Sequence, residues 1–115
     1  MKVSITGSRG FNDYLVFCKH INNFKKDNSI KFIISGGAKG VDSLASKYSL
    51  ENYIGLKEIL PNWNKYGKRA GILRNIEIIE NSDFNIIFWD GESKGTKFNI
   101  DYCTKNNKDY IVIDI

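Results

Sequence analysis

Three short glycine-bearing segments hold the residues of this chain best suited to bind an anion. They are Gly7-Ser8-Arg9, Gly36-Gly37-Ala38-Lys39-Gly40 and Gly91-Glu92-Ser93-Lys94-Gly95-Thr96. Each follows a β-rich run and precedes a helical pattern. Glycines at such a turn let backbone N–H groups approach a phosphate, and the helix dipole favours negative charge. The second and third segments are predicted to bind phosphate, although neither matches GxxxxGK[ST] or GxGxxG. The alternative for each is a tight strand-to-helix turn.

Charged side chains in and near these segments extend the predicted site. Of the 17 basic residues only three are arginines, namely Arg9, Arg69 and Arg74. A guanidinium binds phosphate with two parallel hydrogen bonds, so we predict that Arg9 and Arg74 contact a ligand. A surface salt bridge for Arg9 and a solvated side chain for Arg74 are the alternatives. Asp42 either favours the start of the second helix or accepts hydrogen bonds from a ribose or base.

The segment from Pro61 to Arg69 is long for a connection in an α/β protein, where about 2–6 residues are usual. It contains two aromatic residues, Trp63 and Tyr66. A connection that crosses the sheet can overhang the ligand site, and both aromatic rings are then candidates for stacking on a base. Anchoring of the loop on the domain is the alternative role for both.

β-rich runs alternate with helical patterns along the whole chain. We expect strands at Lys2–Thr6, Phe32–Ser35, Lys57–Leu60, Asn85–Trp89 and Tyr110–Ile113, with helices from about Asp13, from about Gly40, over Ala70–Glu80 and over Thr96–Lys105. Right-handed crossovers then give a parallel sheet with helices on both faces. The economical solution is one α/β domain over residues 1–115, a Rossmann-like doubly wound sheet, for which we expect the strand order 3-2-1-4-5. Ligands bind such sheets at the carboxyl ends of the strands, here between the first and fourth.

Composition excludes several classes of protein. The chain has 115 residues, of which 42% are hydrophobic and 26% charged, as in globular domains. No apolar run approaches the roughly 20 residues of a membrane span. The start of the chain turns polar too soon for a signal peptide, so we expect a cytoplasmic protein. Two cysteines without metal-ligand spacing and one histidine predict no metal site, no cofactor and no Ser-His-Asp triad. The net charge of +4, spread over scattered lysines, suits a small anionic ligand as well as nucleic acid.

Five motifs in order resemble the YspA-like branch of the SLOG superfamily. They are the first seven residues with Ser8-Arg9, Gly36–Asp42, Asn62–Lys68, Arg74–Glu77, and Phe88–Gly91 with Ser93–Thr96. The resemblance implies a Rossmann-like fold and a nucleotide or nucleotide-derived, signalling-type ligand. Relatives include the Lonely Guy phosphoribohydrolases, DNA-processing proteins that bind single-stranded DNA, and sensors of signalling nucleotides. It also implies ligand-binding roles for Gly7, Ser8, Arg9, Gly36, Gly37, Gly40, Asp42, Arg74, Asn75, Gly95 and Thr96.

One departure from the hydrolases bears on catalysis. They carry a glutamate three residues after the threonine of the last motif, and here that position is Asn99. An amide cannot act as the general acid or base that N-glycosidic cleavage needs. We therefore expect nucleotide binding without turnover, in a sensor or a sponge. Hydrolysis of a nucleoside monophosphate, with Asp101, Glu77, Asp42 or Asp90 as the acid, is the second hypothesis. Binding of single-stranded nucleic acid is the third, disfavoured because the positive charge forms no stripe.

The resemblance also implies a homodimer or higher homo-oligomer. Ile72 and Ile78 are expected on the outer face of their helix, where they would serve such an interface.

Overall fold

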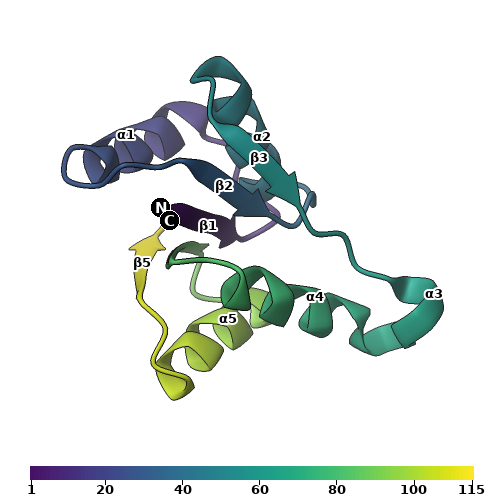
Figure 1. Cartoon of the computed structure of the whole chain (residues 1–115). Helices are drawn as coiled ribbons and strands as arrows, with labels where there is room; N and C mark the ends of the chain where they lie inside the picture. The colour runs from purple at the N-terminus through teal and green to yellow at the C-terminus, as the bar shows by residue number, and fades with distance from the viewer.

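The computed structural model describes all 115 residues, and a five-stranded sheet runs through its middle (Figure 1). The strands are β1 Lys2–Gly7, β2 Phe32–Ser35, β3 Gly55–Glu58, β4 Phe84–Trp89 and β5 Tyr110–Asp114. Their order is β3-β2-β1-β4-β5 and every neighbouring pair is parallel. The predicted Rossmann-like α/β fold and its strand order are confirmed.

Helices cover both faces of this sheet (Figure 1). They are α1 Tyr14–Lys25, α2 Val41–Glu51, the short α3 Trp63–Tyr66 followed by a 3-10 turn at Gly67–Arg69, α4 Ala70–Glu80 and α5 Lys94–Lys105. On one face α1 and α2 pack on the larger core cluster, while α4 and α5 lie on the other face. None of the helices combines the length and apolar character that crossing a membrane requires.

The central strand β1 shows how side-chain alternation builds both the core and the site. Val3 and Ile5 point into the larger cluster and are fully buried there. Ser4 and Thr6 point to the opposite face, where the Ser4 hydroxyl donates to Asn85 Oδ1 at 2.6 Å. The same alternation therefore places Thr6, at the carboxyl end of β1, on the face that α4 and α5 cover.

Strand β3 begins two residues earlier than predicted. Gly55 to Glu58 pair with Phe32 to Ser35, so the end of β2 sets the end of β3. Ile59 lies just beyond the strand, donates its N–H to the Ser35 carbonyl at 2.9 Å and is buried against Ile34 and Ile78. The expected last strand residue, Leu60, is instead 66% exposed.

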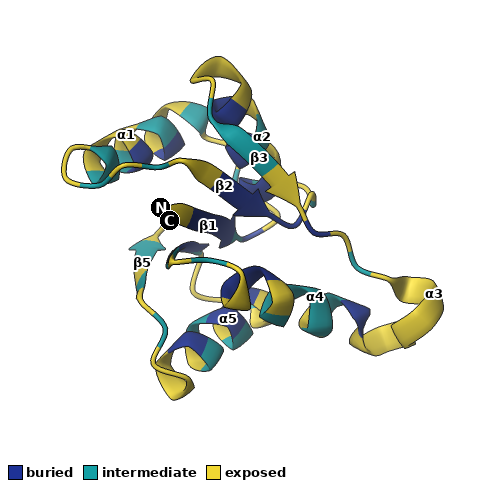
Figure 2. Cartoon of the chain, in the orientation of Figure 1, coloured by how far each residue is buried: buried dark blue, intermediate teal, exposed yellow.

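The crossing segment after β3 is partly helical, which the sequence reading missed. Asn62 caps α3, because its side chain accepts a hydrogen bond from the Lys65 N–H at 3.1 Å. Figure 2 shows α3 as an exposed projection beside the sheet, and Trp63 and Tyr66 are 55% and 43% exposed. Both rings are thus accessible, and their two suggested roles, stacking on a base and anchoring of the loop on the domain, stay predictions.

Helix α4 uses a wider apolar face than predicted. Ile79 is buried as expected, and Leu73 and Ile76 are half-buried. The placement of Ile78 on the outer face is wrong, because Ile78 is 1% exposed and packs on Ile34 and Ile59. The helix spans the space between β2 and α5, so apolar residues on both of its flanks find partners. Only Ile72 remains outside, and the expected oligomer interface loses one of its two residues.

Gly40 is the glycine that the fold most clearly requires. Its φ is +72° and a Cβ there would lie 2.4 Å from the Arg9 carbonyl oxygen. Gly40→Ala should therefore lower the free energy of unfolding by more than about 1 kcal/mol. Gly95→Ala is the matched control, because a Cβ at Gly95 meets nothing within 4 Å and alanine favours the helix. Urea denaturation measures both, and equal destabilisation by the two changes would contradict this account.

Candidate functional site

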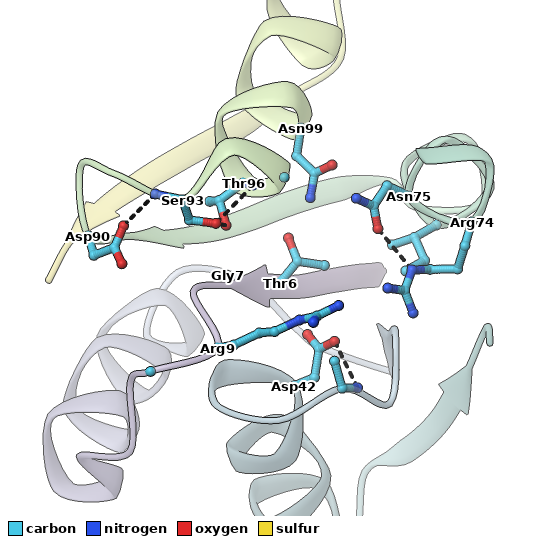
Figure 3. Close-up of a pocket in the computed structure, with 14 residues that line it drawn as sticks. Thr6, Gly7, Arg9, Asp42, Arg74, Asn75, Asp90, Ser93, Thr96 and Asn99 are labelled. Atoms are coloured by element: carbon cyan, nitrogen blue, oxygen red, sulfur yellow. Dashed lines mark hydrogen bonds between the residues drawn. The ribbon is translucent and has the colours of Figure 1, made fainter. Parts of the chain in front are cut away.

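A pocket of about 440 Å³ opens at the carboxyl ends of β1 and β4 (Figure 3). We call it the central pocket. It lies where the strand order reverses, the position at which doubly wound sheets bind ligands. Its lining consists of Thr6, Gly7, Arg9, Gly10, Ala38, Asp42, Arg74, Asn75, Ile78, Asp90, Ser93, Gly95, Thr96 and Asn99. All three predicted glycine-bearing segments contribute to it.

The start of α5 forms one wall of the central pocket. Ser93 caps the helix, with its hydroxyl 3.4 Å from the Thr96 N–H and 3.0 Å from the Thr96 hydroxyl. Asp90 holds the preceding turn by accepting from the N–H groups of Glu92 and Ser93, both at 2.9 Å, and these bonds lower its pKa. Gly95 has open space beside its Cα. The first turn of α5 is thus built and capped, yet open to the pocket.

Arg74 enters from α4 and holds the turn after β2. Its Nη1 donates to the Gly36 carbonyl at 2.6 Å and to the Ile59 carbonyl at 3.4 Å, while its Nε donates to Asn75 Oδ1 at 2.9 Å. A Cβ on Gly36 would lie 2.6 Å from Arg74 Nη1 and 2.9 Å from Asp42 Oδ2. Glycine at this position lets Arg74 and Asp42 approach one another across the turn.

Asp42 is a buried carboxylate with one oxygen in use. It is 6% exposed. Its Oδ2 accepts from the Ala38 N–H at 3.1 Å, and its Oδ1 has no hydrogen-bond partner. Burial raises the pKa of Asp42, while the Ala38 N–H and the charge of Arg74 act in the opposite direction. Burial also lowers the pKa of Arg74, and Asp42 opposes that shift. Asp42 therefore organises the turn with one oxygen and lines the central pocket, while its other oxygen is buried without a hydrogen-bond partner.

Asn99 is a second buried acceptor in the central pocket. It lies one helical turn after Thr96, is 4% exposed, and its Oδ1 has no partner. Figure 3 shows its amide directed from α5 into the pocket. From the sequence, Asn99 was notable only because it replaces the glutamate of the hydrolases. Thr6, Gly10 and Ile78 also line the pocket and were not predicted to be site residues. The alternation along β1 was the one available signal for Thr6.

Arg9 reaches across the pocket between Thr6 and Asp42 (Figure 3). Neither of the two salt bridges in the structure involves it. The expected alternative, a surface ion pair that would hold Arg9 away from a ligand, is not realised.

Several predicted residues lie outside the central pocket. Ser8 and Gly36 are buried behind it, Gly40 packs on the backbone of Arg9, and Lys94 does not line it. A neighbouring pocket of about 520 Å³, which we call the outer pocket, is lined by Gly37, Lys39 and Trp63 among others. Tyr66 lines neither of these two pockets.

In the predicted phosphate loop before α2, backbone N–H groups already donate hydrogen bonds within the chain. The Ala38 N–H bonds Asp42, and the Val41 N–H bonds the Ser8 carbonyl at 3.3 Å. The two glycine-bearing loops are therefore not equivalent, and the one before α5 is the more open.

Comparison with known proteins gives two sequence matches. The model of the YspA, cpYpsA-related SLOG family matches residues 1–66. The Gene 61 protein of Mycobacterium phage D29 is 31% identical over 103 residues, which cover 84% of this chain and 82% of that protein. The chain belongs to this SLOG family. The family match extends from β1 to α3, so Asp42 lies inside it and Arg74 and Asn99 lie beyond it.

A solved structure extends the likeness of this SLOG chain to its full length. The X-ray structure of DNA processing protein A from Streptococcus pneumoniae superimposes with a TM-score of 0.79 at 20% sequence identity. The match covers 99% of this chain and 50% of that one. The chain thus spans half the length of this neighbour and shares its fold.

Asp42→Asn tests the role of the buried carboxylate in the central pocket. The amide oxygen can still accept from Ala38, and the buried charge is removed. Because the pKa of Asp42 is raised by burial, the wild type loses stability as the pH rises through the folded-state pKa. We expect the variant to melt higher than the wild type at about pH 8, with a difference that shrinks towards about pH 4. Circular dichroism measures both melting temperatures, and a variant less stable at all pH values would contradict the assignment.

Proposed function

We propose that the central pocket binds a nucleotide or nucleotide-derived ligand without turning it over. The observation that carries this proposal is the pairing of two guanidinium groups with two unpartnered buried oxygens in one pocket. Arg9 and Arg74 supply positive charge, and Asp42 Oδ1 and Asn99 Oδ1 supply acceptors. A nucleotide carries the complementary groups, namely phosphate oxygens together with ribose hydroxyls and base N–H groups.

The cationic half of the pocket favours a phosphate. Arg74 commits its Nη1 and Nε to the chain, and its Nη2 donors remain for a ligand. Arg9 commits none of its donors to an ion pair. Charge-assisted bonds from guanidinium to phosphate are about twice as strong as neutral ones and are often bidentate. The open first turn of α5 adds a favourable dipole beside them.

The acceptor half of the pocket favours hydroxyl and amine donors. An unpartnered buried oxygen costs roughly 1–3 kcal/mol. A ligand that donates to Asp42 Oδ1 and Asn99 Oδ1 would recover part of that cost on binding. Ribose hydroxyls and exocyclic amines are donors of the right kind, whereas inorganic phosphate is mainly a hydrogen-bond acceptor. This half of the pocket supports a nucleotide over a simple anion.

Absence of turnover rests on the identity of residue 99. The SLOG hydrolases that the chain resembles carry a carboxylate at the position of Asn99, and an amide transfers no proton at neutral pH. A protein that binds a signalling nucleotide and leaves it intact serves as a sensor or as a sponge. A sponge requires only the affinity of this pocket, whereas a sensor also requires that the bound ligand alters a partner.

Arg9→Lys tests the ligand class with little risk to the fold, since Arg9 is exposed and unpaired. Arg74 is less suitable because its guanidinium also holds the turn at Gly36. Loss of the bidentate geometry should weaken nucleotide affinity roughly tenfold or more. Calorimetry with ribonucleoside mono-, di- and triphosphates measures this effect.

Arg69→Lys is the matched control, because Arg69 lies outside both pockets, and its affinities should equal those of the wild type. Binding of oligodeoxythymidine but of no mononucleotide would contradict the proposal and favour the DNA-binding alternative that the fold of DNA processing protein A raises.

One observation favours hydrolysis of a nucleoside monophosphate as a second candidate function. Asp42 lies in the central pocket with a raised pKa and a free oxygen. A carboxyl group that holds its proton nearer neutral pH is suited to protonate a leaving base. This geometry differs from the hydrolase arrangement, in which the carboxylate would stand at position 99.

An incubation assay separates the two candidate functions. The wild type should release no free base from the monophosphates over hours, as followed by chromatography. Asn99→Glu should create or raise release, because it supplies a carboxylate one helical turn from Thr96. Free base produced by the wild type and abolished in Asp42→Asn would overturn the binding-only proposal and establish Asp42 as the acid.

A further inference from the structure

The central and outer pockets are two parts of one cleft. They share Arg9, Ala38 and Arg74 as lining residues. The guanidinium groups of Arg9 and Arg74 therefore lie where the two pockets meet, which we call the junction. The central pocket on one side has a volume of about 440 Å³ and the outer pocket on the other side about 520 Å³. A phosphate bound between Arg9 and Arg74 has open volume in two directions.

The two sides of the junction offer different chemistry. The central pocket presents the buried acceptors Asp42 and Asn99. The outer pocket presents the apolar surfaces of Leu60, Pro61 and Trp63, with Lys39 beside them. Hydrogen-bonding groups of a ligand fit the first, and a flat ring fits the second. Each volume lies within the range of small-molecule sites.

Two side chains in the apolar wall of the outer pocket lie against the backbone at glycines. A Cβ at Gly37 would lie 2.7 Å from Leu60 Cδ2, so Leu60 sits directly on the Gly37 backbone. A Cβ at Gly71 would lie 3.7 Å from the ring of Trp63. Despite these contacts Leu60 is 66% and Trp63 55% exposed. A positioned and half-exposed indole offers a surface on which a base can stack, beside the cations at the junction.

We propose that the cleft takes phosphate-bridged dinucleotides, with the bridging phosphate at Arg9 and Arg74 and the second base on Trp63. This inference rests on the proposed function, because it assigns the first nucleoside to the central pocket. It adds that a nucleoside monophosphate fills only half of the site. Trp63 is the residue that sets the preference for the larger ligand.

Calorimetry with three sets of probes tests the inference on the whole chain. The sets are the four ribonucleoside 5′-monophosphates, their symmetric 5′–5′ dinucleoside diphosphates, and their linear 3′–5′ dinucleotides with a 5′-phosphate. We expect at least one dinucleotide to bind about tenfold or more tightly than its monophosphate. Trp63→Ala should remove this preference by weakening dinucleotide binding much more than monophosphate binding, while Trp63→Phe should keep most of it.

Tyr66→Ala is the matched control, since Tyr66 is an exposed aromatic residue of the same short helix that lines neither pocket. It should bind all probes as the wild type does. Equal affinity for monophosphates and dinucleotides, or a Trp63→Ala variant that loses affinity for both alike, would overturn the inference and leave the proposed function standing. Failure of every nucleotide to bind would reject the proposed function and the inference with it.

Discussion

Ser8 is the junction on which the geometry of the site depends. Its N–H donates to the Phe88 carbonyl at 3.1 Å, its carbonyl accepts from Val41, and its hydroxyl accepts from the Asp90 N–H at 3.2 Å. One buried residue thereby ties the loop after β1 to the start of α2 and to the loop after β4. Only glycine at position 40 allows the first two loops to come this close. These bonds fix the positions of the three loops relative to one another. The loops form a frame that holds the side chains of the pocket in place.

This frame carries polar groups that the fold does not satisfy. Asp42 and Asn99 each keep a buried oxygen without a hydrogen-bond partner. Burial raises the pKa of Asp42 and lowers the pKa of Arg74, and both shifts favour the neutral form of the side chain. A chain selected for stability alone would fill or pair such groups. Their cost is tolerable because the sheet packs its helices through three buried apolar core clusters. Local departures from good packing of this kind concentrate at functional sites.

The sequence predicted what depends on local pattern. Alternating β-rich and helical segments with glycine at the turns predicted a doubly wound parallel sheet. The strand order expected for that fold then predicted the location of the pocket. Features that depend on contacts between distant parts of the chain could not be predicted from the sequence. The start of β3 is set by pairing with β2, and the burial of Ile78 by Ile34 and Ile59. The motif alignment placed Asn99 only at the position of the hydrolase glutamate. Its burial in the pocket, with an unpartnered oxygen, depends on how α5 packs against β4 and α4.

The two glycine-rich loops show why similar local sequences acquire different roles. Before α2, the N–H groups of Ala38 and Val41 bond Asp42 and Ser8, so that helix start is closed by the chain itself. Before α5, the side chains of Asp90 and Ser93 accept the hydrogen bonds of the turn and of the helix start. Gly95 has no side chain, so the first turn of α5 stays open. The first loop builds the frame and brings Asp42 to the pocket, while the second leaves room for an anion. Two apparent phosphate loops thus combine into one site, because in a parallel sheet both converge on the same crevice. Ser8, in the loop after β1, fixes them relative to one another through its bonds to Val41 and Asp90.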